Sequence, residues 1–177
     1  MTTEMTTDRA AAVRPGVPIE HDGPAAVEAR MANPAHVVPG AMAALLDLGK
    51  ALDRSGLAAA TRELVHVRAS QINGCGVCGV QHQRVAKRRG ETDERLWAVA
   101  GWRDAPYYTG AERAALELTE AVTRLADTAD PVPDPVWADA AAHFDTQQLG
   151  ALVLTIASIN LWNRLNVSTH QVAGQEW

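Results

Sequence analysis

The sequence has few cysteines, few aromatic residues and no long apolar run. Two cysteines occur among 177 residues, and aromatic residues make up 5% of the chain. A secreted protein stabilised by disulfides would carry more cysteines, spread along its length. The longest apolar stretch, residues 149–161, is interrupted by Thr155 and Ser158 and falls short of the roughly 20 residues that a membrane span needs. These features exclude a disulfide scaffold and predict no membrane association.

Basic residues are also scarce. Lys and Arg number 16 against 21 Asp and Glu, a formal net charge of -5. Because phosphate binding needs a basic surface, this balance argues against nucleic acid as a partner. The N-terminal residues lack the apolar core of a signal peptide, so we expect a cytoplasmic protein. In a reducing compartment, two close cysteines are more often catalytic or metal-binding than structural.

Helix-forming residues dominate the rest of the chain. Ala, Leu, Arg and Glu are frequent, and apolar positions recur at intervals of three and four residues. We therefore expect an all-α protein, with residues 1–24 as a flexible N-terminal arm and residues 25–177 as one helical domain. The expected helices are residues 41–53, 58–71, 73–90, a short helix capped by Thr92, residues 109–127, and a long helix that begins near Asp145. The proline-rich residues 130–135 are expected to form an extended linker.

The two cysteines, Cys75 and Cys78, stand three residues apart, directly after the Asn73-Gly74 turn signal. If a helix begins at Asn73, both lie near its N-terminus, where partial positive charge favours thiolate over thiol. Residues three apart on a helix have Cβ atoms about 5–6 Å apart, which is close enough for a disulfide to form. The spacing is typical of a reversible dithiol.

His82 and Glu63 are the expected partners of this pair. His82 follows Cys78 by four residues and falls on the same helix face, where an imidazole can act as base or as a stabilising cation. A charge within about 4–6 Å shifts a thiol pKa by about one to three units, whereas a helix terminus contributes less than about one. We therefore expect Cys78 to be the more acidic thiol. Glu63 lies on the preceding helix, and its carboxylate could fix the imidazole tautomer. His66, His143 and His170 have no evident partner and are expected to be structural.

Glu63, Cys75, Cys78 and His82 match the pattern E-x11-C-x2-C-x3-H. The chain thereby resembles the alkyl hydroperoxidase D-like (AhpD-like) branch of the carboxymuconolactone decarboxylase family, over roughly residues 41–165. The resemblance implies a compact all-α fold, a homo-oligomer, and peroxidase or disulfide-reductase activity. It also implies a hydroperoxide substrate and an external dithiol or protein reductant, with neither cofactor nor metal.

The resemblance assigns a role to each of the four residues. It implies that the Cys78 thiolate attacks the peroxide, that Cys75 is the resolving thiol, and that Glu63 with His82 relays protons. Some relatives place a further histidine just before the second cysteine, where this chain has Val77. We therefore expect a shorter proton relay and weaker peroxidase activity here.

Two other functions remain open on the sequence. A zinc-binding protein could use Cys75, Cys78 and His82, with Glu63 as a further ligand, since zinc accepts all these ligand types. A non-redox ring-opening or decarboxylating enzyme of the wider family is the second alternative, although such chemistry needs no cysteine pair. A thioredoxin-like protein is disfavoured, because its CxxC motif would follow a strand and no strand pattern is apparent.

Overall fold

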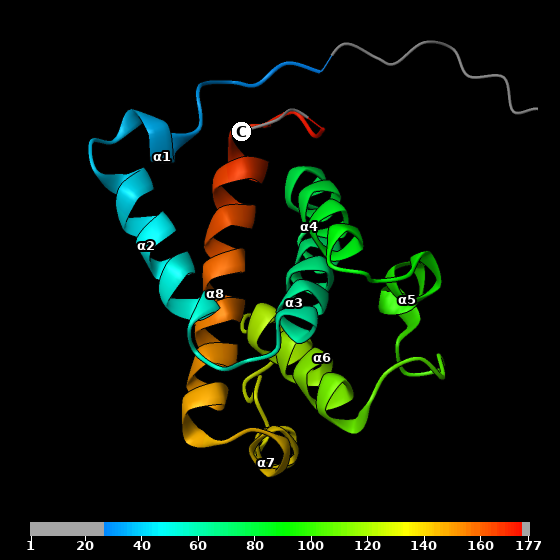
Figure 1. The fold of residues 1–177 in the computed structure, drawn as a ribbon. Coiled ribbons are helices and arrows are strands. Elements are labelled where there is room, and N and C mark those ends of the chain that lie inside the picture. The colour runs from blue at the N-terminus through cyan, green and yellow to red at the C-terminus, as the bar shows by residue number, and fades with distance from the viewer. Residues whose placement is uncertain (1–26, 175–177) are drawn as a thin grey trace, which may run out of the picture.

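A computed structural model describes residues 27–174, so the predicted N-terminal arm, residues 1–24, lies outside the described residues. Within residues 27–174 the chain is helical and contains no strand (Figure 1), which confirms the all-α prediction. The elements are α1 (Pro34–Val37), α2 (Ala41–Asp53), α3 (Ala59–Ile72), α4 (Gly76–Arg88), α5 (Asp93–Ala98), the 3-10 helix η1 (Val99–Gly101), α6 (Gly110–Thr123), α7 (Asp134–His143) and α8 (Thr146–Ser168). No helix in this part of the chain combines the length and apolar character needed to cross a membrane.

Three helices begin at the caps that the sequence predicts. The Thr92 side chain accepts a hydrogen bond from the first turn of α5. Thr109 with Glu112 opens α6, and Asp145 with Gln148 opens α8; each pair forms a reciprocal capping box. These side chains satisfy backbone N–H groups that have no partner inside the helix, and they fix where each helix starts.

Helix α7 differs from the prediction of an extended linker over residues 130–135. Pro133 is the N-cap of α7, and Pro135 lies in its first turn. A proline there costs no hydrogen bond, because the first N–H groups of a helix have no acceptor within it. The linker prediction is therefore wrong from Asp134 onward.

Helix α3 lies at the centre of the packing. Eight of its 14 residues are buried, and it packs against α4, α6 and α8. In Figure 1, α8 runs along the molecule between α2 and the antiparallel pair of α3 and α4. The largest fully buried side chains come mostly from these central helices: Leu64, Val65, Val67, Leu116, Leu118, Leu152, Ile156 and Ile159.

Large apolar side chains on α2 and α8 remain exposed in the single chain. Leu46 is 53% exposed, Leu154 50% and Leu161 38%. Because burying such side chains is worth about 25 cal/mol per Å², we expect two or more copies of the chain to associate through them. Light scattering at micromolar concentration should give a multiple of the 18.9 kDa chain mass.

Substitutions sharpen this prediction. Leu154→Glu and Leu161→Glu should each weaken the oligomer, because a carboxylate resists burial. Leu125→Glu, at a residue 55% exposed just beyond α6, serves as the matched control and should leave the mass unchanged. A wild-type mass near that of one chain rejects the idea.

Candidate functional site: a buried dithiol beside a carboxylate–histidine cluster

Helix α4 begins at Gly76, three residues after the predicted start at Asn73. Asn73 ends α3 instead of capping α4, and Gly74 makes the turn with a φ of 65° that favours glycine. Cys75 is the N-cap of α4, where its Sγ accepts a hydrogen bond from the backbone N–H of Cys78 at 3.4 Å. The positive end of α4 therefore acts on Cys75 directly, while Cys78 sits within the first turn.

Both cysteines are free thiols and both are buried. Cys75 is 3% exposed and Cys78 4%, and they pack with Ala69, Val77 and Ile159. Burial alone would raise the pKa of each thiol, because it disfavours the charged form. Hydrogen bonds therefore decide which sulfur carries charge.

The two thiols are coupled by a hydrogen bond between them. Donation from the Cys78 thiol, followed by its backbone N–H and the amides of Asn163 and Asn166, overcomes burial and lowers the pKa of Cys75 to about 6. The same hydrogen bond, together with burial, raises the pKa of Cys78. The two sulfurs therefore share a proton across this hydrogen bond, and the N-cap position favours the negative charge on Cys75.

This result differs from the expectation that His82 makes Cys78 the more acidic thiol. The pKa of Cys78 is set mainly by Cys75 and by burial, and His82 is not among the principal causes. The physical reason is that Cys75 occupies the N-cap, where it receives both a thiol and a backbone donor. The expectation is therefore wrong for the resting dithiol.

Glu63 and His82 meet as predicted. Glu63 projects from α3 and is buried, with its side chain 7% exposed. Its Oε2 lies 2.8 Å from Nδ1 of His82 on α4. Burial opposes ionisation of Glu63, but the neighbouring imidazoles of His66 and His82 outweigh it and lower the pKa of Glu63 to about 2. A carboxylate here holds the Nδ1 proton of His82 and leaves its Nε2 available for proton transfer.

His66 joins this cluster, although a structural role was predicted for it from the sequence. Its ring centroid lies 4.0 Å from that of His82, and its Nδ1 lies 3.5 Å from Glu63 Oε2, too long for a good hydrogen bond. Burial, followed by the neighbouring His82, lowers the pKa of His66 to about 4. His66 is therefore neutral at physiological pH. The signal in the sequence is its position three residues after Glu63, which places both on one face of α3.

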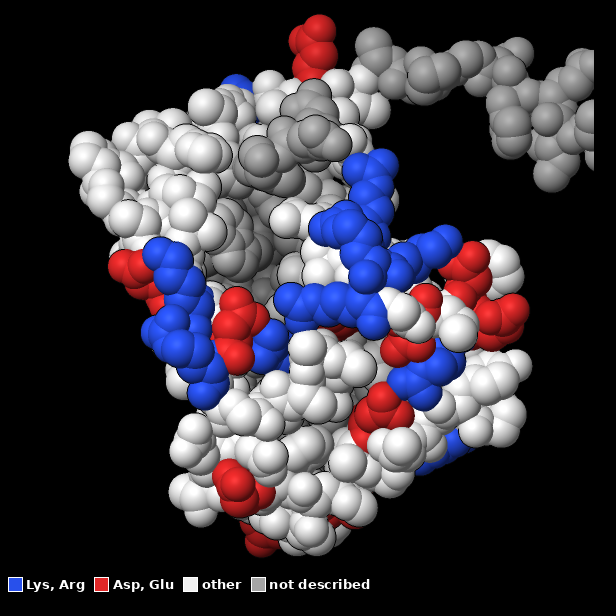
Figure 2. Space-filling view, in the orientation of Figure 1, with Lys and Arg blue, Asp and Glu red and all other residues white. Residues whose placement is uncertain are grey.

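The C-terminal end of α4 supplies positive charge beside Glu63. Arg89 Nη1 lies 3.6 Å from Glu63 Oε1, and Lys87 pairs with Asp93 at 2.8 Å. Figure 2 shows basic side chains gathered over this part of the molecule, with acidic groups among them. Basic residues at a helix C-terminus are favoured by the helix dipole. The basic end of α4 therefore complements both the helix dipole and the Glu63 carboxylate.

Asparagine amides from α8 line the other side of the dithiol. Asn160, Asn163 and Asn166 recur every three residues and are buried. Asn166 Nδ2 donates to Cys78 Sγ at 3.2 Å, and Asn163 Nδ2 donates to Ser70 Oγ at 3.1 Å. Asn73 ties the turn before Cys75 to this row, because its Nδ2 donates to Asn163 Oδ1 at 2.8 Å. This amide row was not predicted from the sequence.

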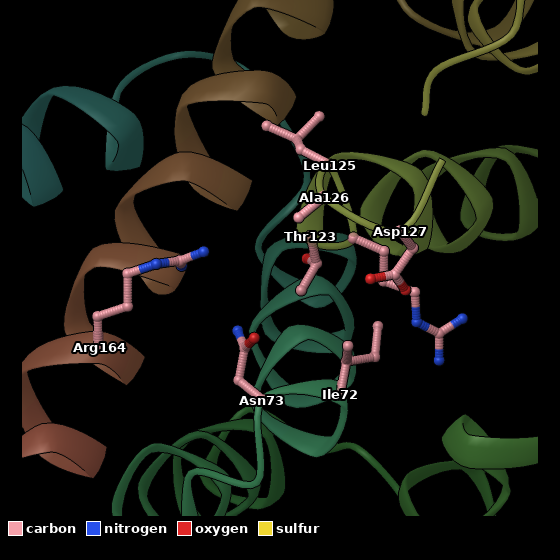
Figure 3. A pocket seen from close by; sticks show the side chains of 8 residues that line it. Ile72, Asn73, Thr123, Leu125, Ala126, Asp127 and Arg164 are labelled. Atoms are coloured by element: carbon pink, nitrogen blue, oxygen red, sulfur yellow. The ribbon is translucent and has the colours of Figure 1, made fainter. Parts of the chain in front are cut away.

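A cavity of about 350 Å³ lies beyond the row, between the ends of α3 and α6 and the side of α8 (Figure 3). Asn73, Thr123 and Arg164 contribute polar groups to its wall. Of the residues lining it, Asn73 also belongs to the hydrogen-bond network around the thiols. None of the four predicted site residues lines this cavity.

The residues that could hold a metal ion overlap only in part with those of the zinc alternative. Among the described residues, one group brings three suitable ligand atoms within 4.8 Å of one another: Glu63, His66 and His82. Neither cysteine belongs to it. The structure therefore separates the dithiol from the possible ligands, although zinc accepts such histidines and carboxylates.

Comparisons with known proteins agree with this architecture. The model of the carboxymuconolactone decarboxylase family matches residues 39–121. The uncharacterized protein YdfG of Bacillus subtilis is 36% identical over 132 residues, 75% of this chain and 88% of YdfG. The uncharacterized protein YnjA of Escherichia coli is 40% identical over 114 residues, 64% of this chain and 60% of YnjA.

Solved structures extend the comparison. One similar structure is a protein of unknown function from Agrobacterium tumefaciens, suggested to be an antioxidant defence protein AhpD. It has a TM-score of 0.77 and 32% sequence identity, and the alignment covers 84% of this chain and 100% of that protein. The debrominase Bmp8 has a TM-score of 0.65 at 20% sequence identity, and the alignment covers 76% of this chain and 72% of the Bmp8 chain. At that identity Bmp8 shares the fold alone.

The largely buried His66, with its side chain 17% exposed, should make stability depend on pH. Its folded pKa of about 4 lies below the ordinary value of 6.5. Between these values the unfolded chain binds more protons than the folded one, so the free energy of unfolding falls as the pH drops from 6.5 toward 4, by up to about 3 kcal/mol. Urea unfolding across this range should show a smaller decline for His66→Gln than for wild type. His143→Gln, at a more exposed histidine, is the control. Equal declines in all three proteins would contradict the assignment.

Proposed function

Since this chain belongs to the carboxymuconolactone decarboxylase family, in its AhpD-like branch, we propose that it is a thiol-dependent peroxidase that uses the Cys75–Cys78 dithiol. The suggested antioxidant role of the Agrobacterium tumefaciens relative supports this reading. The observation that carries the proposal is the shared proton of the pair. A dithiol with one pKa near 6 presents a thiolate at neutral pH, and the thiolate is the reactive form toward peroxides.

The proposed reaction begins with a proton shift within the pair. The proton on Cys78 moves to the Cys75 sulfur along the hydrogen bond that joins them, which leaves the thiolate on Cys78. This thiolate attacks the distal oxygen of a hydroperoxide, so that an S–O bond forms and the O–O bond breaks. The sulfur is oxidised by two electrons to a sulfenic acid, and the departing alkoxide takes a proton to become an alcohol.

Resolution closes the disulfide. The Cys75 sulfur attacks the sulfenic sulfur of Cys78, an S–S bond forms, and the hydroxyl leaves with a proton as water. An external dithiol or protein reductant of the cytoplasm then reopens the disulfide by thiol–disulfide exchange. The spacing of N-cap and first turn suits this step, because it allows a disulfide without unwinding α4.

Glu63 and His82 form the proposed proton relay. The ionised Glu63 orients His82 through Nδ1 at 2.8 Å, and His82 lies four residues after Cys78 on the continuous helix α4. The imidazole can deliver a proton to the alkoxide and recover one when the dithiol is regenerated. Val77, where some relatives have a histidine, leaves this relay without a further member.

Cysteine variants test the proposal. Peroxide should convert the wild-type dithiol to an intramolecular disulfide, seen by mass spectrometry as the loss of two hydrogens in the peptide that holds both cysteines. Cys75→Ser should form a sulfenic acid at Cys78 that a dimedone probe traps, but should not turn over. Cys78→Ser should form no trapped sulfenic acid.

Three outcomes would contradict this assignment. Trapping lost in Cys75→Ser but kept in Cys78→Ser would make Cys75 the attacking thiolate. Oxidation of both cysteines to sulfonic acid would reject the dithiol mechanism. One equivalent of zinc in the purified protein, lost together with the fold on chelation, would instead support a metal-binding protein.

Variants of the relay make a second prediction. Glu63→Gln and His82→Ala should each slow peroxide reduction about tenfold or more, because general acid catalysis contributes about 10²–10⁴-fold. If the two act as one unit, the double variant should be little slower than the worse single variant. His143→Ala serves as the matched control and should react at the wild-type rate. If the fold-decrease in rate for the double variant equals the product of the two single fold-decreases, the residues act separately.

A further inference from the structure

A chain of hydrogen bonds leads from α1 to the sulfur of Cys78. The backbone N–H of Ala35 donates to Asn33 Oδ1 at 2.9 Å, where Asn33 caps the N-terminus of α1. Asn33 Nδ2 donates to Asn166 Oδ1 at 2.8 Å. Asn166 Nδ2 then donates to Cys78 Sγ at 3.2 Å. Three side chains from distant parts of the sequence thus form one continuous line.

The direction of this line is set by its first member. A backbone N–H can only donate, so the atom of Asn33 that faces Ala35 is its oxygen. The nitrogen of Asn33 therefore faces Asn166, and the atom of Asn166 that accepts from it is again an oxygen. The remaining group of Asn166, its NH₂, is left to face the sulfur. Cys78 is consequently always presented with a donor.

The surrounding contacts hold both asparagines in place. Asn33 is 3% exposed and Asn166 4%, so neither amide can exchange its partner for water. Residues before α1 are bound to the end of α8, because Arg30 N donates to Thr169 O at 2.9 Å and Gln171 Nε2 donates to Met31 O at 2.8 Å. Both asparagines lie outside residues 39–121, the part that matches the family model.

We propose that Asn166, oriented by Asn33, is a catalytic residue of the dithiol, and that its amide stabilises negative charge on the sulfur of Cys78. The contribution of this hydrogen bond to peroxide reduction rests on the proposed function, whereas its effect on the Cys78 thiolate does not. A hydrogen bond to a charged acceptor is stronger than one to a neutral acceptor, so the amide favours the anion over the thiol. Because the amide nitrogen lies 3.2 Å from Cys78 Sγ, this donation reduces the cost of placing the charge on Cys78 and assists the proton shift that precedes attack.

A titration tests this role without any peroxide. In a Cys75→Ser background Cys78 is the one remaining thiol, and serine preserves the N-cap of α4. Asn166→Ala in this background should raise the pKa of Cys78 by about one or more, measured by ultraviolet thiolate absorbance, and slow alkylation near neutrality about tenfold. Asn160→Ala removes a buried amide of the same helix that donates to Thr123 and not to sulfur. This control should leave the pKa of Cys78 and its alkylation rate unchanged.

Substitutions of Asn33 test the orientation and keep Asn166 in place. Asn33→Asp and Asn33→Ser both retain a side chain that can cap α1. A carboxylate at position 33 cannot donate, so Asn166 must turn its NH₂ toward it and present an oxygen to the sulfur. Asn33→Asp should therefore raise the pKa of Cys78 more than Asn33→Ser does. The same two substitutions of Asn33 in the Asn166→Ala background measure the effect of the added charge alone. The difference in the pKa of Cys78 between the Asp and Ser variants should be smaller in that background.

The outcomes separate the inference from the proposed function. Equal pKa values for Cys78 in the Asn166→Ala and Asn160→Ala proteins would overturn the inference. It would also be overturned if the pKa of Cys78 differed between Asn33→Asp and Asn33→Ser by the same amount with and without Asn166→Ala. The expected shifts in a protein that nonetheless fails to reduce peroxide would retain Asn166 as a thiolate-stabilising residue and reject the peroxidase.

Discussion

A buried negative charge on α3 sets the arrangement of the site. The Glu63 carboxylate is almost removed from solvent, and an unpaired charge in such a place would cost several kcal/mol. Its partners are His66 on the same helix and His82 and Arg89 on α4. Because these groups must converge on one carboxylate, the antiparallel pairing of α3 and α4 has a single register. The same register carries Cys75 and Cys78 against α8.

Two different environments therefore meet along α4. Toward the cysteines, α8 offers neutral amides that donate hydrogen bonds to sulfur. Toward the C-terminal end of α4, the ionised Glu63 is surrounded by imidazoles and a guanidinium. Neutral donors can stabilise a thiolate without fixing a proton nearby, whereas a carboxylate–imidazole pair can move one. The part of the chain that the structure describes thus places the amide donors and the carboxylate–imidazole pair in adjacent but separate regions of the site.

Features encoded within a few residues were accessible from the sequence. The capping residues Thr109 and Asp145, the helical periodicity, and the CxxC pattern with His82 one turn later are all local signals, and the corresponding helices are present. The inward position of Glu63 could be proposed only through the resemblance, because a glutamate on a helix is usually solvated. The N-cap of α4 was misplaced by two residues, because Asn73 is a good cap by type but ends α3 instead.

The missed features depend on contacts between distant segments. His66 has no polar partner in its own turn apart from Glu63, and its role becomes visible only when α4 brings His82 against its ring. Asn166 contacts Cys78 across 88 positions of sequence. The acidity of Cys75 follows from its neighbour's thiol and from cap geometry, which spacing alone does not reveal. Such relations come from tertiary packing and leave no periodic trace in the chain.

The bond between Asn33 and Asn166 also bears on how the protein matures. These residues are 133 positions apart, so their contact closes one of the longest loops in the described chain, and the entropic cost of loop closure rises slowly with length. Contacts of such separation form late when a chain folds. During synthesis α4 emerges from the ribosome well before α8. Until α8 has been made, Cys78 lacks its amide donor. Its oriented environment is thus acquired only when the final helix docks, which delays assembly of the finished dithiol site until nearly the whole described chain has been made.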